Sequence, residues 1–525
     1  MFKMIQRFNS TSSPNNQHIK ESTPLKTNLQ ENIRTIRKLV GNSPDIVIRE
    51  FGIGKKREIK IALVFTEGLS DAQSVNQFIM ESLMLDIQEH DVSLDHPSKL
   101  FTFQLLKELL PVGNVKDVSD FEALLPSILS GDAAILLNGY SQGLIVGLKG
   151  WEDRGVQEPS SQTVIRGPKE GFSENIRTNT ALVRRKIKDP NLWLENLTIG
   201  RVTKTTVNIM YIQGIANEKV VEEVRKRLTR IEIDSILEGG YIEELIQDET
   251  YTVFPTVFHT ERPDVIAAGL LEGRIAIFVD GTPFVLLVPV IFSQFFSAAE
   301  DYYQRSDIAT LLRLLRYLAF FIALLAPSLY IAITTFHQEV LPPGLLFSLM
   351  AQREGVPFPA FIEALLTELI FELLREAGIR MPRAVGQAVS IVGALVIGQA
   401  AVEAGIISAS MVIVVSITAI SSFIIPAYNL AISVRILRFG MMGLAASFGF
   451  LGVIVGIIAV MQHLCQLRSF GVPYMAPFAP MVMTDQKDAI FRAPWWGMFS
   501  RPRFVSQRNV SREDDSSTQQ SRRKT

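Results

Sequence analysis

The hydrophobic and polar positions are distributed unevenly along the chain, and the pattern changes near residue 281. Before this point, apolar and polar residues are interleaved in short stretches. From residue 282 to residue 464, charged residues are rare and long apolar runs dominate. Such runs are typical of membrane-spanning helices. The pattern therefore predicts an N-terminal soluble α/β region with two subdomains, followed by an all-α polytopic membrane domain.

The soluble region is predicted to contain four segments. Residues 1–28 are rich in Ser, Asn and Gln, and we expect a disordered head because they bury little apolar surface. Strand-like and helix-like patterns alternate in residues 29–150 and again in residues 191–281, which predicts an α/β subdomain in each. Between them, residues 151–190 are polar and rich in arginine, and we expect a linker or an exposed connection.

The membrane domain, residues 282–464, is predicted to contain four to six spans. The run 283–296 is short and interrupted by Pro289, so a re-entrant or interfacial helix fits it as well as a span. Pro327 and Pro426 interrupt longer runs and predict either kinks or hinges. Four runs are strong candidates for spans: about 314–336, 384–404, 408–433 and 440–464.

After the last apolar run, residues 465–525 predict a Pro-rich segment and a basic disordered tail. The side of the membrane on which this tail lies stays open. Five spans place the loop arginines on the inner side, as the positive-inside tendency favours, whereas six spans place the basic tail there. The N-terminus lacks the apolar region of a secretory signal, so we expect the N-terminal domain to be cytoplasmic.

Composition and motifs narrow the possible functions. The chain has 525 residues and a formal net charge of -1, which does not indicate a nucleic-acid partner. Cys465 is the single cysteine, which excludes an intrachain disulfide. His259, His337 and His463 show no metal-ligand spacing, and NGYSQG at 138–143 lacks the context of a nucleophile or phosphate loop. We therefore expect no enzyme activity, cofactor or metal site.

An apolar helix is predicted at residues 359–377, and it carries several ionisable side chains: Glu363, Glu368, Glu372, Arg375 and Glu376. At about 100° per residue, the last four share one face and Glu363 lies off it. Three interpretations stay open. The helix lines an ion path or a proton-titrating site, it joins neighbouring helices through ion pairs, or it lies flat at the membrane interface.

A second set of candidate residues consists of glycines in the last apolar run. Gly449, Gly452 and Gly456 repeat small residues at a spacing that lets helices approach closely. We therefore interpret them as helix-packing positions rather than as a site of chemistry.

Several ungapped blocks between residues 29 and 480 resemble one protein family. They include EGLSD at 67–71, EGRIAIFVDGTP at 272–283, AQREGVPFP at 351–359, MPRAVG at 381–386 and VIGQAAVEAG at 396–405. In these blocks the chain resembles the A subunit of GerA-type spore germinant receptors.

The resemblance implies a multi-pass protein of the spore inner membrane that works with a transporter-like B subunit and a lipoprotein C subunit. It also implies a homo-oligomer that forms a nutrient-gated channel for monovalent cations. On this hypothesis, Val356 to Pro359 would form a constriction, and Glu363, Glu368 and Glu372 would attract cations beside Arg375. The alternative is a non-conducting scaffold or signal-relay subunit. A secondary transporter is a third possibility, although no inverted repeat is visible.

Overall fold

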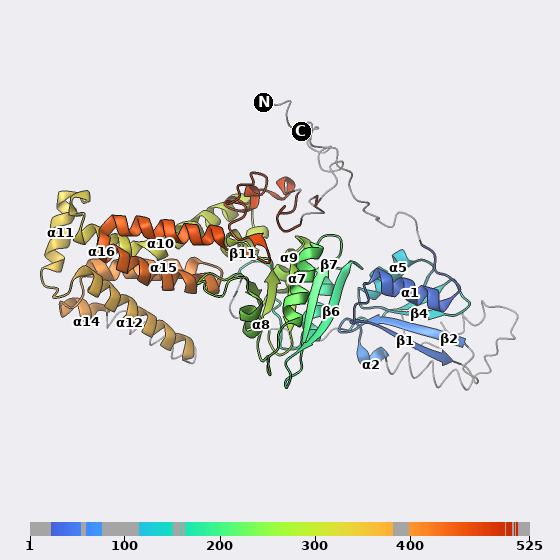
Figure 1. Cartoon of the computed structure of the whole chain (residues 1–525). Helices are drawn as coiled ribbons and strands as arrows, with labels where there is room; N and C mark the ends of the chain where they lie inside the picture. The colour runs from blue at the N-terminus through green and yellow to red at the C-terminus, as the bar shows by residue number, and fades with distance from the viewer. Residues whose placement is uncertain are drawn as a thin grey trace, which may run out of the picture.

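The computed structural model describes most of the chain: residues 23–53, 59–75, 115–150, 164–381, 398–498 and 500–506, with the single residues 159, 162, 509, 511 and 512. Its parts lie in a row (Figure 1). A first α/β unit lies at one end, a second α/β unit in the middle, and a helical part at the other end. The predicted fold class, an α/β region followed by a helical region with apolar helices, is confirmed.

The first α/β unit contains one antiparallel sheet. Its strands follow the spatial order β1-β2-β4-β5-β3. Leucine and isoleucine side chains of α1 and α5 pack on one face of the sheet because they recur at helical spacing. The bounds are β1 (Ile46–Ile53), β2 (Ile59–Thr66), β3 (Val115–Val118), β4 (Ala133–Leu137), β5 (Gly143–Val146), α1 (Leu29–Leu39), α2 (Ala72–Ser74) and α5 (Phe121–Ile128).

The second α/β unit repeats this topology. Its strand order is β6-β7-β9-β10-β8, in which each strand is the counterpart of the strand five numbers earlier. Helices α6 and α9 cover one face, and α7 and α8 cover the other. The bounds are α6 (Ile176–Lys186), β6 (Leu192–Ile199), β7 (Thr205–Ile212), α7 (Glu218–Thr229), α8 (Gly239–Ile246), β8 (Phe258–Thr260), α9 (Pro263–Leu271), β9 (Ile275–Val279) and β10 (Val285–Val288).

Two predictions about this region are wrong. The run 283–296 is not a membrane helix, because Val285–Val288 is strand β10, paired with β9 and β8, and the 3₁₀ helix η4 (Phe292–Phe296) follows it. A strand buried on both faces has the same continuous apolar pattern as a buried helix. The second wrong prediction is the linker or exposed connection at residues 151–190. This stretch contains helix α6, whose Arg184 is fully buried. Within the predicted head, Leu25 is also buried, whereas residues 1–22 lie outside the described residues.

The helical part begins with the 3₁₀ helix η5 and the long helix α10, which continues through Pro327. Helix α15 ends at Ile424, just before Pro426, so the predicted span 408–433 is divided between two helices. Most of the predicted span 384–404 lies outside the described residues. The bounds are η5 (Ala299–Tyr302), α10 (Ser306–Thr335), η6 (Gln338–Val340), α11 (Pro343–Arg353), α12 (Ala360–Arg380), α14 (Gly398–Glu403), α15 (Ala409–Ile424) and α16 (Tyr428–Gln466).

Helix α16 is a hairpin of two helical segments rather than one straight helix. Gly449 has φ +59° and ψ -138°, which is not a helical conformation, and it separates residues 428–448 from residues 450–466. A Cβ atom placed on Gly456 would lie 2.5 Å from the sulfur of Met441. Fifteen residues of straight helix would separate these positions by about 22 Å. The prediction of one continuous span over 440–464 is therefore wrong.

Length and composition make two of the described helices, α10 and α16, candidates for crossing a membrane. Because α16 folds back at Gly449, its segments are about 31 Å and 25 Å long at 1.5 Å per residue. Both are close to the hydrocarbon thickness of a bilayer, about 30 Å. The helical part therefore has an apolar set of helices that run along one another, as Figure 1 shows.

The C-terminal segment is folded where the structure describes it. It contains β11 (Arg468–Ser469), β12 (Val472–Pro473), η8 (Gln486–Asp488) and η9 (Trp495–Gly497). The segment contacts both the second unit and α10: Arg512 pairs with Glu272 at 2.7 Å, and Arg313 pairs with Asp488 at 3.0 Å. The expectation of a disordered tail is wrong for this part, and residues 513–525 lie outside the described residues.

The second α/β unit and the helical part share a continuous core. One buried apolar cluster extends from α6 and α9, through Phe292 and Tyr474, to α10, α15 and α16. Polar contacts also join the two parts. The loop before β8 contacts residues near the beginning and near the end of α16. Ser433 donates to the carbonyl of Val253, and His463 Nε2 lies 2.8 Å from Thr252 Oγ1.

Candidate functional site

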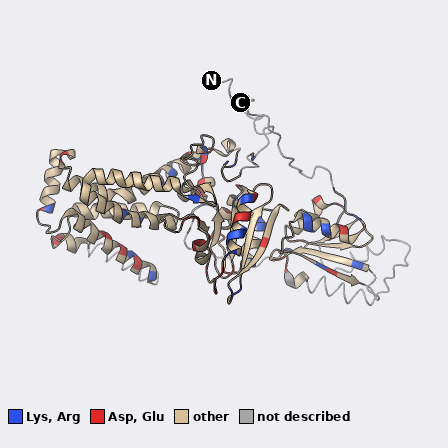
Figure 2. Ribbon diagram, in the orientation of Figure 1, with Lys and Arg blue, Asp and Glu red and all other residues tan. Residues whose placement is uncertain are grey.

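The ionisable helix of the sequence analysis is α12, and it is distinct among the helices of the helical part. Figure 2 shows positive and negative positions along α12, whereas α10, α15 and α16 consist almost entirely of other residues. Pro359 is the exposed N-cap residue, and the helix continues beyond Gly378 to Arg380. Glu363 and Glu368 have no exposed surface in the described structure. The acidic face of α12 therefore lies against neighbouring helices of the same chain.

Glu368 is held by an arginine of the α16 hairpin. Arg438 Nη1 donates to Glu368 Oε2 at 2.6 Å, and both side chains are almost completely buried. Arg438 Nε also donates to the carbonyl oxygen of Ala323 on α10, at 2.8 Å. One guanidinium group thus joins α12, α16 and α10. Breaking one partner from a buried pair of this kind costs about 3–5 kcal/mol, because it leaves the other charge uncompensated.

One helical turn farther along, Glu372 contacts two arginines. Its Oε2 lies 3.0 Å from Arg435 Nη1 on α16 and 2.9 Å from Arg375 Nη2 on α12 itself. The side chains of all three residues are mostly buried. The next acid, Glu376, differs because it is exposed and pairs with the exposed Arg380 one turn farther along α12. The polar face of α12 therefore changes from buried to solvent-exposed toward its C-terminal end.

Glu363 has a different environment from the other acids. Its Oε1 accepts hydrogen bonds from the backbone N–H of Ser408, at 2.7 Å, and from the Ser408 hydroxyl. Ser408 is the N-cap of α15, and the positive end of a helix dipole stabilises a carboxylate there. Ser410 lies 3.1 Å from Ser408 and 2.8 Å from the hydroxyl of Tyr330, which extends this hydrogen-bonded chain to α10.

The three buried carboxylates are not saturated by these contacts. Within the described residues, one oxygen of each has no hydrogen-bond partner: Glu363 Oε2, Glu368 Oε1 and Glu372 Oε1. Arg353 Nε lies 3.8 Å from Glu363 Oε2. Each carboxylate can therefore accept from water or contact a cation while it keeps its present partner.

The remaining predicted positions lie at the two ends of the helices. Val356 is partly exposed in the turn after α11, where its N–H donates to Arg353 O at 3.0 Å. At the turn of the α16 hairpin, a Cβ on Gly449 would lie 2.7 Å from the His337 ring, and a Cβ on Gly452 would lie 2.1 Å from Leu444 O. Gly452 and Gly456 thus lie where the two segments of the hairpin approach most closely.

The partners of the acids were missed by the sequence analysis as site residues. Arg435 and Arg438 are three residues apart in an apolar stretch, so they share a helix face. Charged residues inside an apolar run are unusual enough to mark a candidate site, and this pattern could have identified them. Among the described residues, no group of His, Cys, Asp and Glu side chains is arranged to hold a metal ion.

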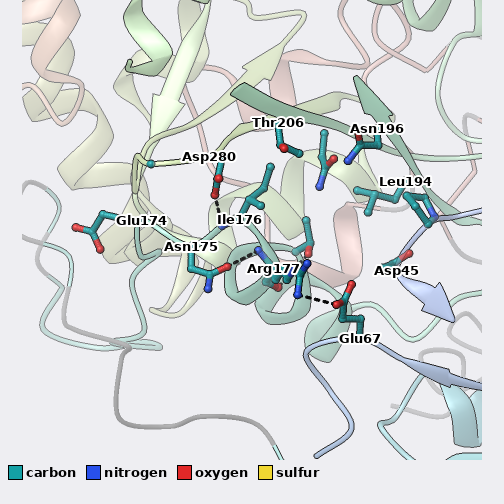
Figure 3. Close-up of a pocket in the computed structure, with 14 residues that line it drawn as sticks. Asp45, Glu67, Glu174, Asn175, Ile176, Arg177, Leu194, Asn196, Thr206 and Asp280 are labelled. Carbon is teal, nitrogen blue, oxygen red and sulfur yellow. Dashed lines mark hydrogen bonds and ion pairs between the residues drawn. The ribbon is translucent and has the colours of Figure 1, made fainter. Parts of the chain in front are cut away.

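A cavity of about 670 Å³ lies between the two α/β units (Figure 3). Arg177 on α6 crosses it to pair with Glu67 of the first unit at 2.9 Å. Carboxylate, amide and hydroxyl groups line it from both units: Asp45, Glu67, Glu174, Asn175, Thr180, Asn196, Thr206, Asn208 and Asp280. Asn208 Oδ1 is buried and has no partner among the described residues. This arrangement can hold a small polar molecule.

A sequence model described as Bacillus/Clostridium GerA spore germination protein matches residues 34–504. The chain belongs to this family. Spore germination protein KA of Bacillus subtilis (strain 168) is 51% identical over 489 residues, which cover 93% of this chain and 89% of that protein. Spore germination protein GerLA of Bacillus cereus is 38% identical over 481 residues, which cover 92% of this chain and 96% of that protein.

One solved structure is similar to part of this GerA family member. It is the N-terminal domain of the A subunit of the Bacillus megaterium spore germinant receptor GerK3, which is 46% identical. The match covers 52% of this chain and 99% of that chain, with a TM-score of 0.42. The family model and the relatives confirm the resemblance to germinant-receptor A subunits found in the sequence.

Proposed function

We propose that this chain is the A subunit of a nutrient-sensing receptor in the spore inner membrane, where it assembles with copies of itself and with B and C subunits. In this proposal it is a non-enzymatic subunit that converts nutrient binding into a gated path for monovalent cations. The observation that carries the proposal is the row of buried carboxylates on α12, each held by a donor from another helix.

The ion pairs suggest how such a path would be kept closed. In the described arrangement, Arg438 and Arg435 neutralise Glu368 and Glu372, so these acids attract cations only weakly. A shift of α16 relative to α12 would separate the pairs and expose carboxylate oxygens to a permeating ion. Acidic side chains exposed in this way favour cation passage. Because separating these buried ion pairs costs free energy, the arrangement with both pairs formed would be the closed, resting state of the path.

The junction with the second α/β unit supports the transmission of a signal to these pairs. Arg435 and Arg438 lie on the same helical segment as Asn429 and Ser433, which contact the loop and strand at residues 253–259. Asn429 Nδ2 lies 3.1 Å from His259 Nδ1. A movement of the second unit would therefore act directly on the segment that carries the two arginines. We propose that the α/β units lie on the cytoplasmic side.

Ion release from spores tests this proposal. We expect Glu368→Gln and Glu372→Gln to slow the release of monovalent cations after nutrient addition, because each removes a charge that attracts the ion. We expect Arg438→Gln to allow release without nutrient, because it frees Glu368. The matched control is Glu376→Gln, whose side chain is exposed and whose pair is local.

Immunoblots of spore membranes would establish that each variant protein is present at wild-type abundance. Normal release by both Glu368→Gln and Glu372→Gln spores would overturn the assignment of α12 to the ion path. The alternative proposal, a non-conducting scaffold that gathers partner proteins through its α/β units, predicts that outcome.

A further inference from the structure

The C-terminal segment from Met481 to Met498 lies beside the start of the first long apolar helix, as Figure 1 shows for the dark red segment near α10. Its position is fixed by side chains of α10: Arg492 N donates to Thr310 Oγ1 at 3.2 Å, and Arg313 Nη1 donates to Asp488 Oδ1 at 3.0 Å. The segment is therefore level with the first turns of α10.

This segment exposes several large apolar side chains. Phe491, Trp495 and Trp496 are each exposed by more than half, at 56%, 55% and 60%. Met481 and Met483 are exposed still further. Near the start of α10, Ile308, Leu311 and Leu315 are exposed as well. Aromatic residues next to an apolar helix end are typical of the interface between a bilayer and water.

Beside the Trp495 and Tyr302 rings lies Arg492, which has no anionic partner among the described residues. Arg492 is 3% exposed, and within the described residues its Nε and Nη2 have no hydrogen-bond partner. Its Cζ lies 5.2 Å from the Trp495 ring and 5.9 Å from the Tyr302 ring. The nearby Asp488 is engaged by Arg313 and by the Tyr302 hydroxyl. Burial lowers the pKa of Arg492, as expected for a cation that lacks a bonded anion.

We propose that this surface, formed by Arg492, Trp495, Trp496 and Phe491, binds an anionic phospholipid of the leaflet that faces the α/β units. The lipid phosphate would pair with the Arg492 guanidinium beside the Trp495 ring, and the acyl chains would contact the exposed aromatic and methionine side chains. The inference rests on the proposed placement of α10 in the membrane, but not on ion conduction. A lipid fits better than an acidic protein because the exposed aromatic side chains are level with the first turns of α10, a candidate for crossing the membrane.

Tryptophan quenching by brominated lipids tests the proposal on the full chain. Trp151 and Trp193 are replaced by Phe, so that emission comes from Trp495 and Trp496 alone. The chain is reconstituted in phosphatidylcholine vesicles that contain a small fraction of brominated phosphatidylglycerol or brominated phosphatidylcholine. We expect about fivefold stronger quenching by the anionic lipid, the ratio that one basic side chain at a charged surface supports.

Variants and controls decide among the outcomes. Arg492→Gln should remove the preference for the anionic lipid and keep the quenching by both lipids, whereas Arg380→Gln, an exposed arginine of α12, should leave the preference unchanged. Equal quenching by the two lipids, in the chain that has only the Trp151 and Trp193 replacements, would overturn the proposal. So would a preference for the anionic lipid that disappears when inorganic phosphate is added to the buffer. So would unquenched emission from a chain that floats with the vesicles, a result expected if a protein covers this surface. A chain that does not float would contradict the membrane placement itself.

Discussion

At the scale of single residues, the most informative position is Arg184. Its side chain is fully buried, and it joins the two α/β units because Nη2 donates to Asp45 Oδ1 at 3.0 Å and Nη1 donates to Leu192 O at 2.9 Å. The sequence predicted a linker or an exposed connection here because the surrounding stretch is polar and rich in arginine. Burial of a charged residue depends on a partner 139 residues away, which composition and spacing do not indicate.

The Arg184–Asp45 pair leads to a prediction about the contact between the two α/β units. Asp45→Asn should destabilise the contact by about 3–5 kcal/mol, since it leaves the Arg184 charge buried without a carboxylate. Amide hydrogen exchange of the full chain should then become faster in α6 and β1. The control is Glu31→Gln, whose pair with Lys26 is exposed, so its loss should leave exchange in α6 and β1 unchanged. Unchanged exchange in α6 of the Asp45→Asn chain would contradict the proposed role of the pair.

At the scale of elements, the repeated sheet topology has a visible origin in the sequence. GDAAILLNG at 131–139 and GRIAIFVDG at 273–281 have the same length and place β4 and β9 between two glycines. All four glycines have φ between +90° and +96°, a region that side chains with a Cβ rarely adopt. The alternating patterns predicted an α/β subdomain in each region, but the repeat of one topology became visible only from the strand orders.

The hairpin of α16 shows why membrane-like elements are harder to predict. An apolar run that turns back has the same composition as a straight helix, and the glycines used for packing cannot be distinguished from the glycine that turns the chain. The sequence therefore placed Gly449, Gly452 and Gly456 on one continuous helix. In the structure, Gly449 ends the first segment and the other two lie against it.

Cross-linking tests this hairpin. With Cys465 replaced by Ser, the double variant Met441→Cys/Gly456→Cys should form a disulfide under mild oxidation, because the two positions face each other across the turn. The control pair, Met441→Cys/Val455→Cys, should form little disulfide, because Val455 is exposed on the outer surface. A straight helix would hold both pairs apart by more than 20 Å. Failure of the first pair to cross-link would contradict the hairpin.

At the scale of the whole molecule, the parts form a connected series. The cavity between the α/β units is bordered by the second sheet, and the second unit shares a buried apolar cluster with α10, α15 and α16. The loop before β8 contacts α16, the helix that carries the two arginines. The acidic positions on α12 were predictable because charge in an apolar helix is rare. Their partners Ser408, Arg435 and Arg438 were not predicted, because they are 45 to 70 residues away and become neighbours only through packing.

Potassium flux through vesicles that contain the purified chain tests the central claim most directly. The account predicts a larger flux for Arg438→Gln than for the wild-type chain, because the freed Glu368 becomes available to the ion. It also predicts that adding Glu368→Gln and Glu372→Gln to that variant removes the flux. A flux no greater than that of empty vesicles for all three chains would contradict the proposed cation path and would favour the scaffold.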